Sequence, residues 1–339
     1  MKALVIGCGS IGTRHIHNLI RLGIKKIAIF DEDRLKIDKI SKKYKTKKFY
    51  DLNSALSFEP DFSLICTYPT SHLRLANECI KNHSHVFIEK PISFSLLGVE
   101  KMLKKARSQS LQVGVGYNMR FDKGLNLIKN KLLKKEISTP LMIFSEWGYN
   151  VKFWNPGFDP KNHYVLKKGG GIILDDSHEY DYIRWLLEDK VKSVFCQSRR
   201  VSTVKTKTES IAALVLKFSK GTIASLLIDC VRPQYERKCH VIGEKGDLKW
   251  EFLVAKARYN NYQTGVNSRV TTFKLGSKKS QSKNFISRIN DMYVNEMKNF
   301  IDSIKKNTKP MVDGWTGLET LKIGTAALES AKNNRIIRI

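Results

Sequence analysis

Residues 1–12, MKALVIGCGSIG, decide the fold. The apolar run Ala3–Ile6 is typical of a buried strand, and a glycine-rich turn and a helical pattern over Ile11–Leu22 follow it. The pattern G-x-G-x-x-G is weak alone, but between a strand and a helix it is typical of a loop that binds a dinucleotide pyrophosphate. We therefore expect the chain to open with the first βα unit of a dinucleotide-binding domain.

Each position of this loop has an expected role. Gly7 makes the tight turn, Gly9 lets the backbone approach the pyrophosphate, and Gly12 lets the helix and the strand pack closely. Ser10 and Ile11 begin the helix, whose N-terminal N–H groups and partial positive charge suit phosphate oxygens. A glycine-rich turn without a ligand is the structural alternative.

The acidic residue of this fingerprint is expected about 20 residues further on, at the end of the second strand. Asp31 lies 19 residues after the last glycine (31 − 12) and directly follows the apolar run Ile27–Phe30. Its carboxylate would accept a hydrogen bond from a ribose 2′-hydroxyl, and Glu32 and Asp33 would repel a 2′-phosphate, which favours NAD. Arg34 is suited to contact a 2′-phosphate, so NADP stays an alternative cofactor. The two later acids are equally explained as a charge cluster at a helix N-terminus.

The rest of residues 1–120 repeats the alternation of strands and helices. Amphipathic stretches such as His72–Lys81 and Leu96–Arg107 separate short apolar runs. These runs are Ile27–Phe30, Phe62–Cys66, Val86–Ile88 and Leu111–Val115. The alternation predicts βαβ units and a parallel sheet that is buried on both faces. We therefore expect a doubly wound, Rossmann-type domain over residues 1–120.

After about residue 121 the pattern changes to longer strand-like runs joined by turn signals. The runs are Leu141–Trp147, Val191–Ser198, Ser210–Phe218, Thr222–Cys230 and Glu236–Ile242. Helical stripes follow over Tyr293–Ile304 and about Leu318–Lys332, and Lys274–Lys283 is expected to be a loop. The pattern indicates a second α/β domain over residues 121–339 with a large, mostly antiparallel open sheet. Whether the last helix, about Leu318–Lys332, packs back on the first domain is left open.

Two of these runs are apolar on both alternating faces, namely Ile211–Leu216 and most of Ile223–Ile228. A sheet with one solvated face would alternate apolar with polar residues. Helices can cover one face, and a second subunit is the natural cover for the other. We therefore expect a homodimer or a homotetramer that assembles through this sheet.

Composition excludes several classes of protein. The chain has 339 residues, of which 42% are hydrophobic, so it is not wholly disordered. No apolar run approaches the ~18 residues of a membrane helix, and the start, Met1–Gly7, lacks the pattern of a secretory signal. A cytoplasmic protein without a membrane partner is expected. Six scattered cysteines without a Cys-x-x-Cys pair indicate reduced thiols and no metal site.

The formal net charge of +28 raises the question of nucleic acid. Lysines are spread along the whole chain, and neither a basic helix nor an aromatic RNA-binding motif occurs. No nucleic-acid partner is therefore expected. A basic site that attracts a phosphorylated or carboxylated small substrate explains the charge better.

The motifs, taken together, resemble those of the Gfo/Idh/MocA oxidoreductases, a family named for glucose–fructose oxidoreductase, inositol dehydrogenase and a rhizopine-catabolism protein. They occur in the family's order over nearly the whole chain. They are Gly7–Gly12, Thr67–His72, Glu89–Ser93, Tyr117–Phe121, Gly169–Gly171 and Asp175–Asp181. The resemblance implies an NAD(P)-dependent oxidoreductase that acts on a sugar, amino sugar or nucleotide sugar.

The resemblance also assigns cofactor contacts to two further loops. They are Thr67, Tyr68, Pro69 and His72 after the fourth strand, and Glu89 and Lys90 after the fifth. In the family the Lys-Pro peptide bond is commonly cis, so a cis bond between Lys90 and Pro91 is expected.

Oxidising an alcohol removes a hydride from carbon and a proton from oxygen, so the site needs an acid/base group. Lys90 lies just past the carboxyl end of a strand, where open α/β sheets bind ligands. His178 is the natural proton acceptor. On one continuous helix, Asp175 and Asp181 would lie one turn either side of His178 and could orient its imidazole or bind substrate hydroxyls. A surface lysine before a turn proline and a structural histidine beside capping aspartates are the alternatives.

The segment departs from the usual spacing of the family, in which the aspartate and the histidine are four positions apart. Here Asp175 and His178 are three apart, as in a subgroup from surface-sugar biosynthesis that has Asp-x-Ser-His-Glu, so the catalytic role of Asp175 stays open. Further substrate-binding candidates are Asn118, Arg120, Tyr164 and Lys167. Arg120 is equally explained as a salt-bridge residue at the edge of the core.

Two other functions stay open beside the dehydrogenase. One is an epimerase or imine reductase on the same scaffold, and the other is a non-catalytic, NAD-binding regulatory protein, which the fold alone does not exclude. The presence of both Lys90 and His178 speaks against the second, because a protein without catalysis would be free to lose them.

Overall fold

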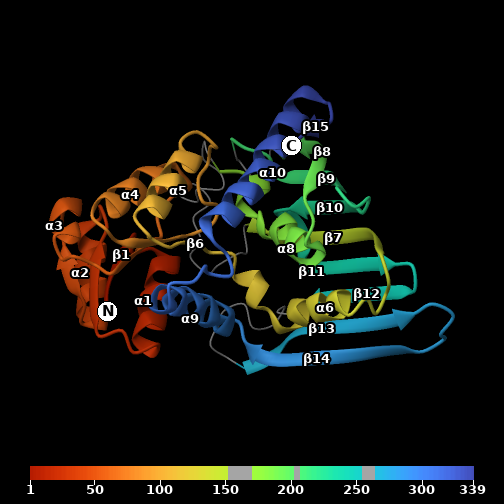
Figure 1. The fold of residues 1–339 in the computed structure, drawn as a ribbon, viewed down its shortest axis with the longest axis horizontal. Helices are drawn as coiled ribbons and strands as arrows, with labels where there is room; N and C mark the ends of the chain where they lie inside the picture. The colour runs from red at the N-terminus through yellow and green to blue at the C-terminus, as the bar shows by residue number, and fades with distance from the viewer. Residues whose placement is uncertain (152–169, 202–206, 254–263) are drawn as a thin grey trace. The chain divides into compact units, whose positions relative to one another are not determined.

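The computed structural model describes residues 1–151, 170–201, 207–253 and 264–339. These residues form two compact units, whose elements are labelled in Figure 1. The first unit contains Met1–Tyr117 and Tyr293–Leu321, and the second contains Asn118–Met292 and Lys322–Ile339.

The first unit is built on a six-stranded sheet in which every neighbouring pair is parallel, in the order β3-β2-β1-β4-β5-β6. Its strands are β1 (Lys2–Ile6), β2 (Lys26–Phe30), β3 (Lys47–Phe49), β4 (Phe62–Ile65), β5 (His85–Ile88) and β6 (Val113–Val115). The chain winds outward from β1 to β3 and then returns to β4 beside β1. Open sheets bind ligands at the carboxyl ends of strands at such a switch point. The predicted Rossmann sheet is confirmed.

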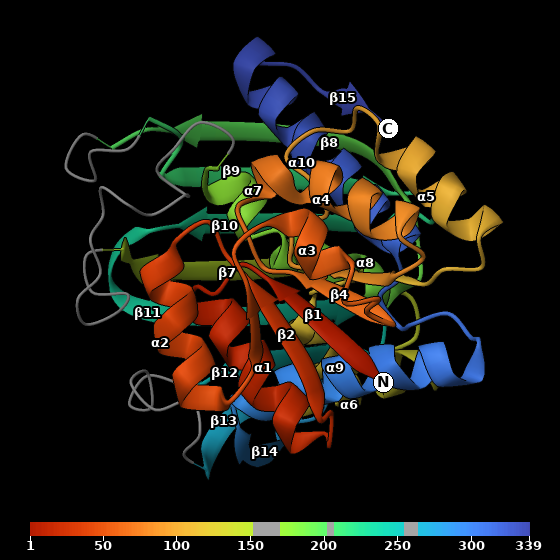
Figure 2. The same cartoon turned by 90° about the vertical axis from the view of Figure 1, so that its left-hand side faces the viewer.

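The helices of this unit follow from amphipathic stripes. They are α1 (Ser10–Arg21), α2 (Arg34–Tyr44), α3 (Leu52–Leu56), α4 (Pro69–Lys81), α5 (Val99–Ser108) and α9 (Asn290–Lys306), together with the start of α10 (Gly314–Asn333). The stripe of α9 was predicted, but not the sheet that it covers. Phe300 of α9 packs edge-on against Phe62 and Phe87 of the first sheet, and α9 lies beside α1 (Figures 1 and 2).

The second unit is built on a nine-stranded sheet in the order β14-β13-β12-β11-β7-β10-β9-β8-β15. Only β7 and β10 pair in parallel among these strands, so the predicted mostly antiparallel sheet is confirmed. The strands are β7 (Pro140–Asn150), β8 (Val191–Arg199), β9 (Ile211–Phe218), β10 (Ile223–Asp229), β11 (Val231–Gly243), β12 (Gly246–Phe252), β13 (Thr264–Lys274), β14 (Ser280–Arg288) and β15 (Ile337–Arg338). Its helical segments are η1 (Asn118–Phe121), α6 (Lys123–Leu133), α7 (Ile172–Asp175), α8 (His178–Leu187) and the end of α10.

Burial alternates along the central strands of this sheet. Leu214 and Leu226 point into a core with residues of α6 and α8, while Val215 and Leu227 on the opposite face are exposed. Phe144 of β7 lies on the same exposed face, since its Cα pairs with Ser225, which pairs in turn with Val215. One face of the sheet therefore stays apolar and exposed in the single chain.

Four strands of this sheet, β12 to β15, were missed, and the prediction of a loop is wrong in part. Residues Lys274–Lys283 include the end of β13 and the start of β14, which pair as a hairpin. The sequence of β14, SQSKNFISR, is mostly polar and exposed because it is an edge strand, so it carries no apolar alternation. The short β3 was missed for the same reason.

Two further predictions concern composition. All six cysteines are buried and unpaired, as reduced thiols were predicted to be. Within the described ranges, no helix combines the length and the apolar character that crossing a membrane requires.

Candidate active site

The glycine-rich loop has the geometry that a dinucleotide phosphate needs. Gly7 has a φ of +95°, and a Cβ at Gly12 would lie 1.9 Å from the Gly7 carbonyl oxygen, so both positions require glycine. A Cβ at Gly9 would meet no atom within 4 Å, so the space above the loop is open. Helix α1 begins at Ser10 without a side-chain cap or an acidic residue in its first turn. The loop therefore offers backbone N–H groups to an anion.

Asp31 lies where the fingerprint predicts it, directly after β2. Its side chain is 13% exposed and accepts hydrogen bonds from the backbone N–H groups of Cys8 (2.7 Å) and Asp33 (3.0 Å). Lys36 Nζ lies 3.3 Å from Asp31 Oδ1, a neighbouring cation that the sequence analysis missed. The carboxylate is therefore held between the phosphate loop and α2.

The residues beside Asp31 have local structural partners. Asp33 caps α2 by accepting the backbone N–H of Lys36 at 3.0 Å, as the helix-terminus explanation predicted. The Arg34 guanidinium lies 5.3 Å from the ring centroid of Tyr50.

The loop after β4 contains Thr67 and Tyr68, and Pro69 begins α4. His72 of α4 is fully buried, with Nδ1 2.9 Å from the Pro91 carbonyl oxygen and Nε2 3.1 Å from that of Thr67. Burial lowers the pKa of His72, and a neutral imidazole has one N–H to donate to these two acceptors. Tyr68, by contrast, is half exposed. His72 thus ties the loop after β4 to the loop after β5.

The loop after β5 begins with Glu89, whose backbone N–H donates to Ile65 at the end of β4 (2.9 Å). The peptide bond between Lys90 and Pro91 is cis, as the resemblance implied. The Glu89 carboxylate is buried and receives a 2.7 Å contact from His15 Nε2 of α1. The sequence analysis did not select His15, because a histidine within an amphipathic helix carries no signal of its own.

The glycine run of the second unit ends at a position that requires glycine. Gly171 has a φ of +111°, and a Cβ there would lie 2.3 Å from a carboxylate oxygen of Glu209. The same carboxylate accepts the backbone N–H of Ile173 at 3.1 Å. Tyr164, Lys167 and Gly169 lie outside the described residues.

The sequence analysis placed Asp175 and His178 on one continuous helix, and this prediction is wrong. Helix α7 ends at Asp175, a turn at Asp176 and Ser177 follows, and α8 begins at His178. Asp175 is buried, whereas His178 at the first position of α8 is partly exposed. The geometry of a continuous helix therefore does not relate these two side chains, and their roles stay predictions.

Two buried ion pairs anchor α8. Arg120 donates to both carboxylate oxygens of Asp181, at 2.8 and 2.7 Å, which fits the salt-bridge explanation of Arg120. Asn118, beside it in η1, is buried as well. Glu179, which the sequence analysis did not select, is fully buried and lies 2.5 Å from Arg237 Nη2.

Arg237 also packs its guanidinium 4.4 Å from the ring centroid of Trp147 in β7. Tyr182 donates its hydroxyl to the other oxygen of Glu179 at 2.6 Å, and burial, with the Glu179 charge, raises the pKa of that phenol. Glu179, the residue after His178, is therefore held by a network of side chains from β7, β11 and α8.

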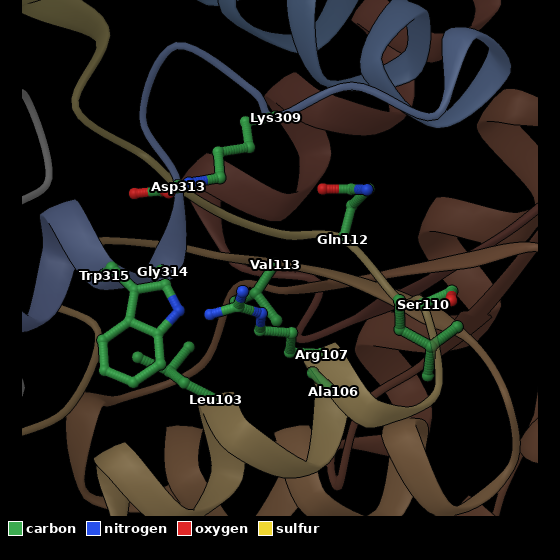
Figure 3. Close-up of a pocket in the computed structure, with 11 residues that line it drawn as sticks. Leu103, Ala106, Arg107, Ser110, Gln112, Val113, Lys309, Asp313, Gly314 and Trp315 are labelled. Atoms are coloured by element: carbon green, nitrogen blue, oxygen red, sulfur yellow. The ribbon is translucent and has the colours of Figure 1, made fainter.

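A separate cavity of about 420 Å³ lies in the first unit between α5, the start of β6 and residues 309–315 (Figure 3). Arg107 extends across it toward the indole of Trp315. The cavity adjoins the amino end of β6, whereas the loops described above follow the carboxyl ends of β1, β4 and β5. It therefore does not belong to the same site. Among the described residues, no group of three or more His, Cys, Asp and Glu side chains is arranged to hold a metal ion.

Comparison with known proteins gives full-length relatives. The myo-inositol 2-dehydrogenase of Thermotoga maritima is 28% identical over 352 residues, covering 100% of this chain and 98% of that protein. The inositol 2-dehydrogenase/D-chiro-inositol 3-dehydrogenase of Lacticaseibacillus casei is 25% identical and covers 100% of this chain and 94% of its own. The WlbA dehydrogenase of Bordetella pertussis, crystallised with NADH and UDP-GlcNAcA, shares the fold with a TM-score of 0.83 at 19% identity, over 100% and 98% of the two chains.

Two family profiles match the sequence. Residues 1–117 match the NAD-binding Rossmann fold of the oxidoreductase family, and residues 149–339 match its C-terminal alpha/beta domain. The first match contains the phosphate loop, whose open face at Gly9 and uncapped helix suit the NAD that the family binds. The chain is therefore a member of the GFO/IDH/MocA oxidoreductase family, an enzyme family that uses NAD.

Proposed function

We propose that this oxidoreductase is a dehydrogenase that transfers a hydride between NAD and a secondary-alcohol carbon of a sugar-type substrate. The observation that carries the proposal is the convergence of three loops in the first unit. A Cβ at Gly7 would lie 2.7 Å from the Cys66 carbonyl oxygen, and Glu89 donates its backbone N–H to Ile65, so the loops after β1, β4 and β5 adjoin one another. Lys90 therefore lies one residue from a carboxylate that is built into the cofactor edge of the sheet.

When bound, NAD supplies the hydride acceptor for alcohol oxidation. The chain has to hold the alcohol and move its hydroxyl proton. We assign the hydrogen bond to the reacting oxygen to Lys90 and proton acceptance to His178, with Asp175 orienting or binding substrate. Relatives named as inositol 2-dehydrogenases support a substrate with several ring hydroxyls.

The charge of the chain bears on the class of sugar. With 60 Lys and Arg against 32 Asp and Glu, the protein's field favours anionic substrates over neutral ones. A neighbour crystallised with UDP-GlcNAcA, which is an anion, supports a nucleotide sugar or a sugar acid as the first class to test.

The test is a screen for formation of NADH with NAD and for its consumption in the reverse direction. The panel contains neutral inositols, hexoses, sugar acids and UDP-sugars, and the same panel is run with NADP. We expect turnover on at least one polyol or sugar. A KM that rises steeply with salt would identify an anionic substrate. NADH binding without turnover on any of them would instead favour a regulatory protein, and interconversion of sugar isomers without net NADH would favour an epimerase.

A further inference from the structure

His15 of α1 forms an unusual buried contact beneath the loop after β5. Its ring is completely buried, and Nε2 lies 2.7 Å from Oε1 of Glu89. Phe87 and Tyr293 pack edge-on against the imidazole, with centroid distances of 5.5 and 6.4 Å. An imidazole and a carboxylate thus share an apolar enclosure one residue before Lys90.

The surroundings of the ring determine its tautomer. Nδ1 of His15 is buried and has no hydrogen-bond partner among the residues that the structure describes. A proton on Nδ1 would leave a buried donor unsatisfied, which costs about 1–3 kcal/mol. The proton therefore belongs on Nε2, where it is donated to Glu89. This hydrogen bond is strongest when Glu89 is ionised.

The Glu89 carboxylate faces four titratable groups from four elements of the first unit. They are His15 of α1, Cys66 after β4, His72 of α4 and the adjacent Lys90. Burial raises the pKa of the Glu89 carboxyl, but its interactions with His15 and then with Lys90 outweigh burial and hold the pKa below its ordinary value.

The second carboxylate oxygen of Glu89 fixes the backbone of the next residue. Oε2 accepts the backbone N–H of Lys90 at 3.2 Å. On its other side the carboxylate lies against Gly116, where a Cβ would come within 2.9 Å of Oε2. His15 on one oxygen and Lys90 on the other therefore leave the carboxylate little freedom to rotate.

We propose that His15 is a positioning residue, which holds Glu89 as an oriented carboxylate and thereby fixes the backbone direction and the electrostatic environment of Lys90. This inference rests on the proposed dehydrogenase function for its kinetic consequence, but not for its structural basis. His15 itself touches neither substrate nor cofactor.

The test compares two substitutions at this position. His15→Leu removes the donor, so less opposes the effect of burial and the pKa of Glu89 rises. His15→Gln keeps an N–H donor on its amide. In His15→Leu, protonation of Glu89 is expected to add to protonation of the group that accepts the substrate proton, so the acidic limb of the pH profile of kcat/KM moves to higher pH. At a pH below that limb, kcat/KM should fall about tenfold for every pH unit by which the limb moves. In His15→Gln the limb is expected to return toward its wild-type position.

Two controls separate positioning from a merely structural effect. His17→Gln on the same helix should leave the pH profile unchanged. In a Glu89→Gln background, His15→Leu should move the limb no further, because the carboxylate whose pKa depends on His15 is gone. A movement of the same size in that background would overturn the proposal, as would a His15→Leu profile that superimposes on the wild-type profile.

A measurement on the resting protein keeps the inference testable if His15→Leu does not fold. The ¹⁵N chemical shifts of imidazole nitrogens distinguish the two neutral tautomers, and His15→Gln identifies the signal of His15. We expect the neutral ring to be the Nε2–H tautomer, and the Nδ1–H tautomer would overturn the proposal. Lack of wild-type turnover on every substrate counts against the proposed function alone, because the tautomer does not depend on it.

Discussion

Arg120 and Asp181 form a buried, two-pronged ion pair, with Nε and Nη2 of the arginine 2.8 and 2.7 Å from the two carboxylate oxygens. The side chains are 5% and 1% exposed, so neither charge is solvated once its partner is removed. The pair connects η1 to α8, the helix that begins with His178. Its first consequence is for the stability of the second unit.

Arg120→Met is expected to lower the free energy of unfolding by about 3–5 kcal/mol, because it removes the two-pronged cationic partner of a carboxylate that is 1% exposed. Urea unfolding followed by circular dichroism measures this loss. Lys104→Ala, which breaks the exposed pair with Glu100, should cost a small fraction of that amount. If the two losses were equal, the buried pair would have no special role in stability.

The phosphate loop offers a sharper contrast between two glycines. Gly9→Ala is expected to leave folding intact, because Gly9 has an extended backbone (φ −68°, ψ −165°) and its Cβ would meet no neighbour. The methyl group would occupy the space that the pyrophosphate approaches, so NADH affinity should fall. Gly12→Ala would place its Cβ 1.9 Å from the Gly7 carbonyl oxygen, so both affinity and Tm should fall.

Fluorescence titration with NADH and thermal unfolding measure the two properties side by side. Equal losses of Tm in Gly9→Ala and Gly12→Ala would contradict the assignment of open space above Gly9.

The next prediction is that the choice between NAD and NADP depends on Asp31 and Lys36. We expect wild type to bind NADH more tightly than NADPH, and Asp31→Ser to reduce this difference in affinity. The substitution removes a negative charge beside the ribose and the 3.3 Å contact of Lys36 Nζ with Asp31, while the 3.8 Å contact of Lys36 with Asp33 remains. In the double variant Asp31→Ser/Lys36→Ala, part of the gained NADPH affinity should be lost again. A wild-type preference for NADPH of tenfold, about 1.4 kcal/mol, would show that the Asp31 argument is wrong.

The exposed apolar face of the second sheet predicts assembly. Sedimentation at micromolar concentration is expected to show a dimer or a larger species, and Leu227→Lys, a charge in the centre of that face, should weaken the association. Leu97→Lys is the control, because Leu97 is 84% exposed and lies in the first unit. A wild-type monomer at these concentrations would leave the apolar face unexplained.

The elements that the sequence predicts best are those whose burial is uniform. The strand β4 is buried at every position, and Phe62–Cys66 is apolar apart from the small, buried Ser63. The glycine loop is predictable because its backbone geometry admits few residue types. The edge strand β14 was missed because most of its side chains are exposed, and pairing alone defines it.

The partners of buried charges were the least predictable part of the site. Glu89 and His15 are 74 positions apart, and Glu179 and Arg237 are 58 apart, and nothing in either local pattern indicates that they meet. The break between α7 and α8 at Asp176 and Ser177 was missed because a helical stripe does not show where one helix ends and the next begins.

The last prediction concerns the chemical step. Lys90→Met should leave NADH affinity nearly unchanged, because that affinity depends mainly on the glycine loop and Asp31, and it should reduce turnover by the ~10²–10⁴ typical of lost acid/base catalysis. His178→Ala should act similarly, because an alcohol proton still needs an acceptor. Asp175→Asn should have a milder effect, since Asp175 lies in α7 and His178 begins α8. Turnover and NADH affinity are measured together on the substrate that the screen identifies, and near wild-type turnover in both Lys90→Met and His178→Ala would refute the catalytic assignment.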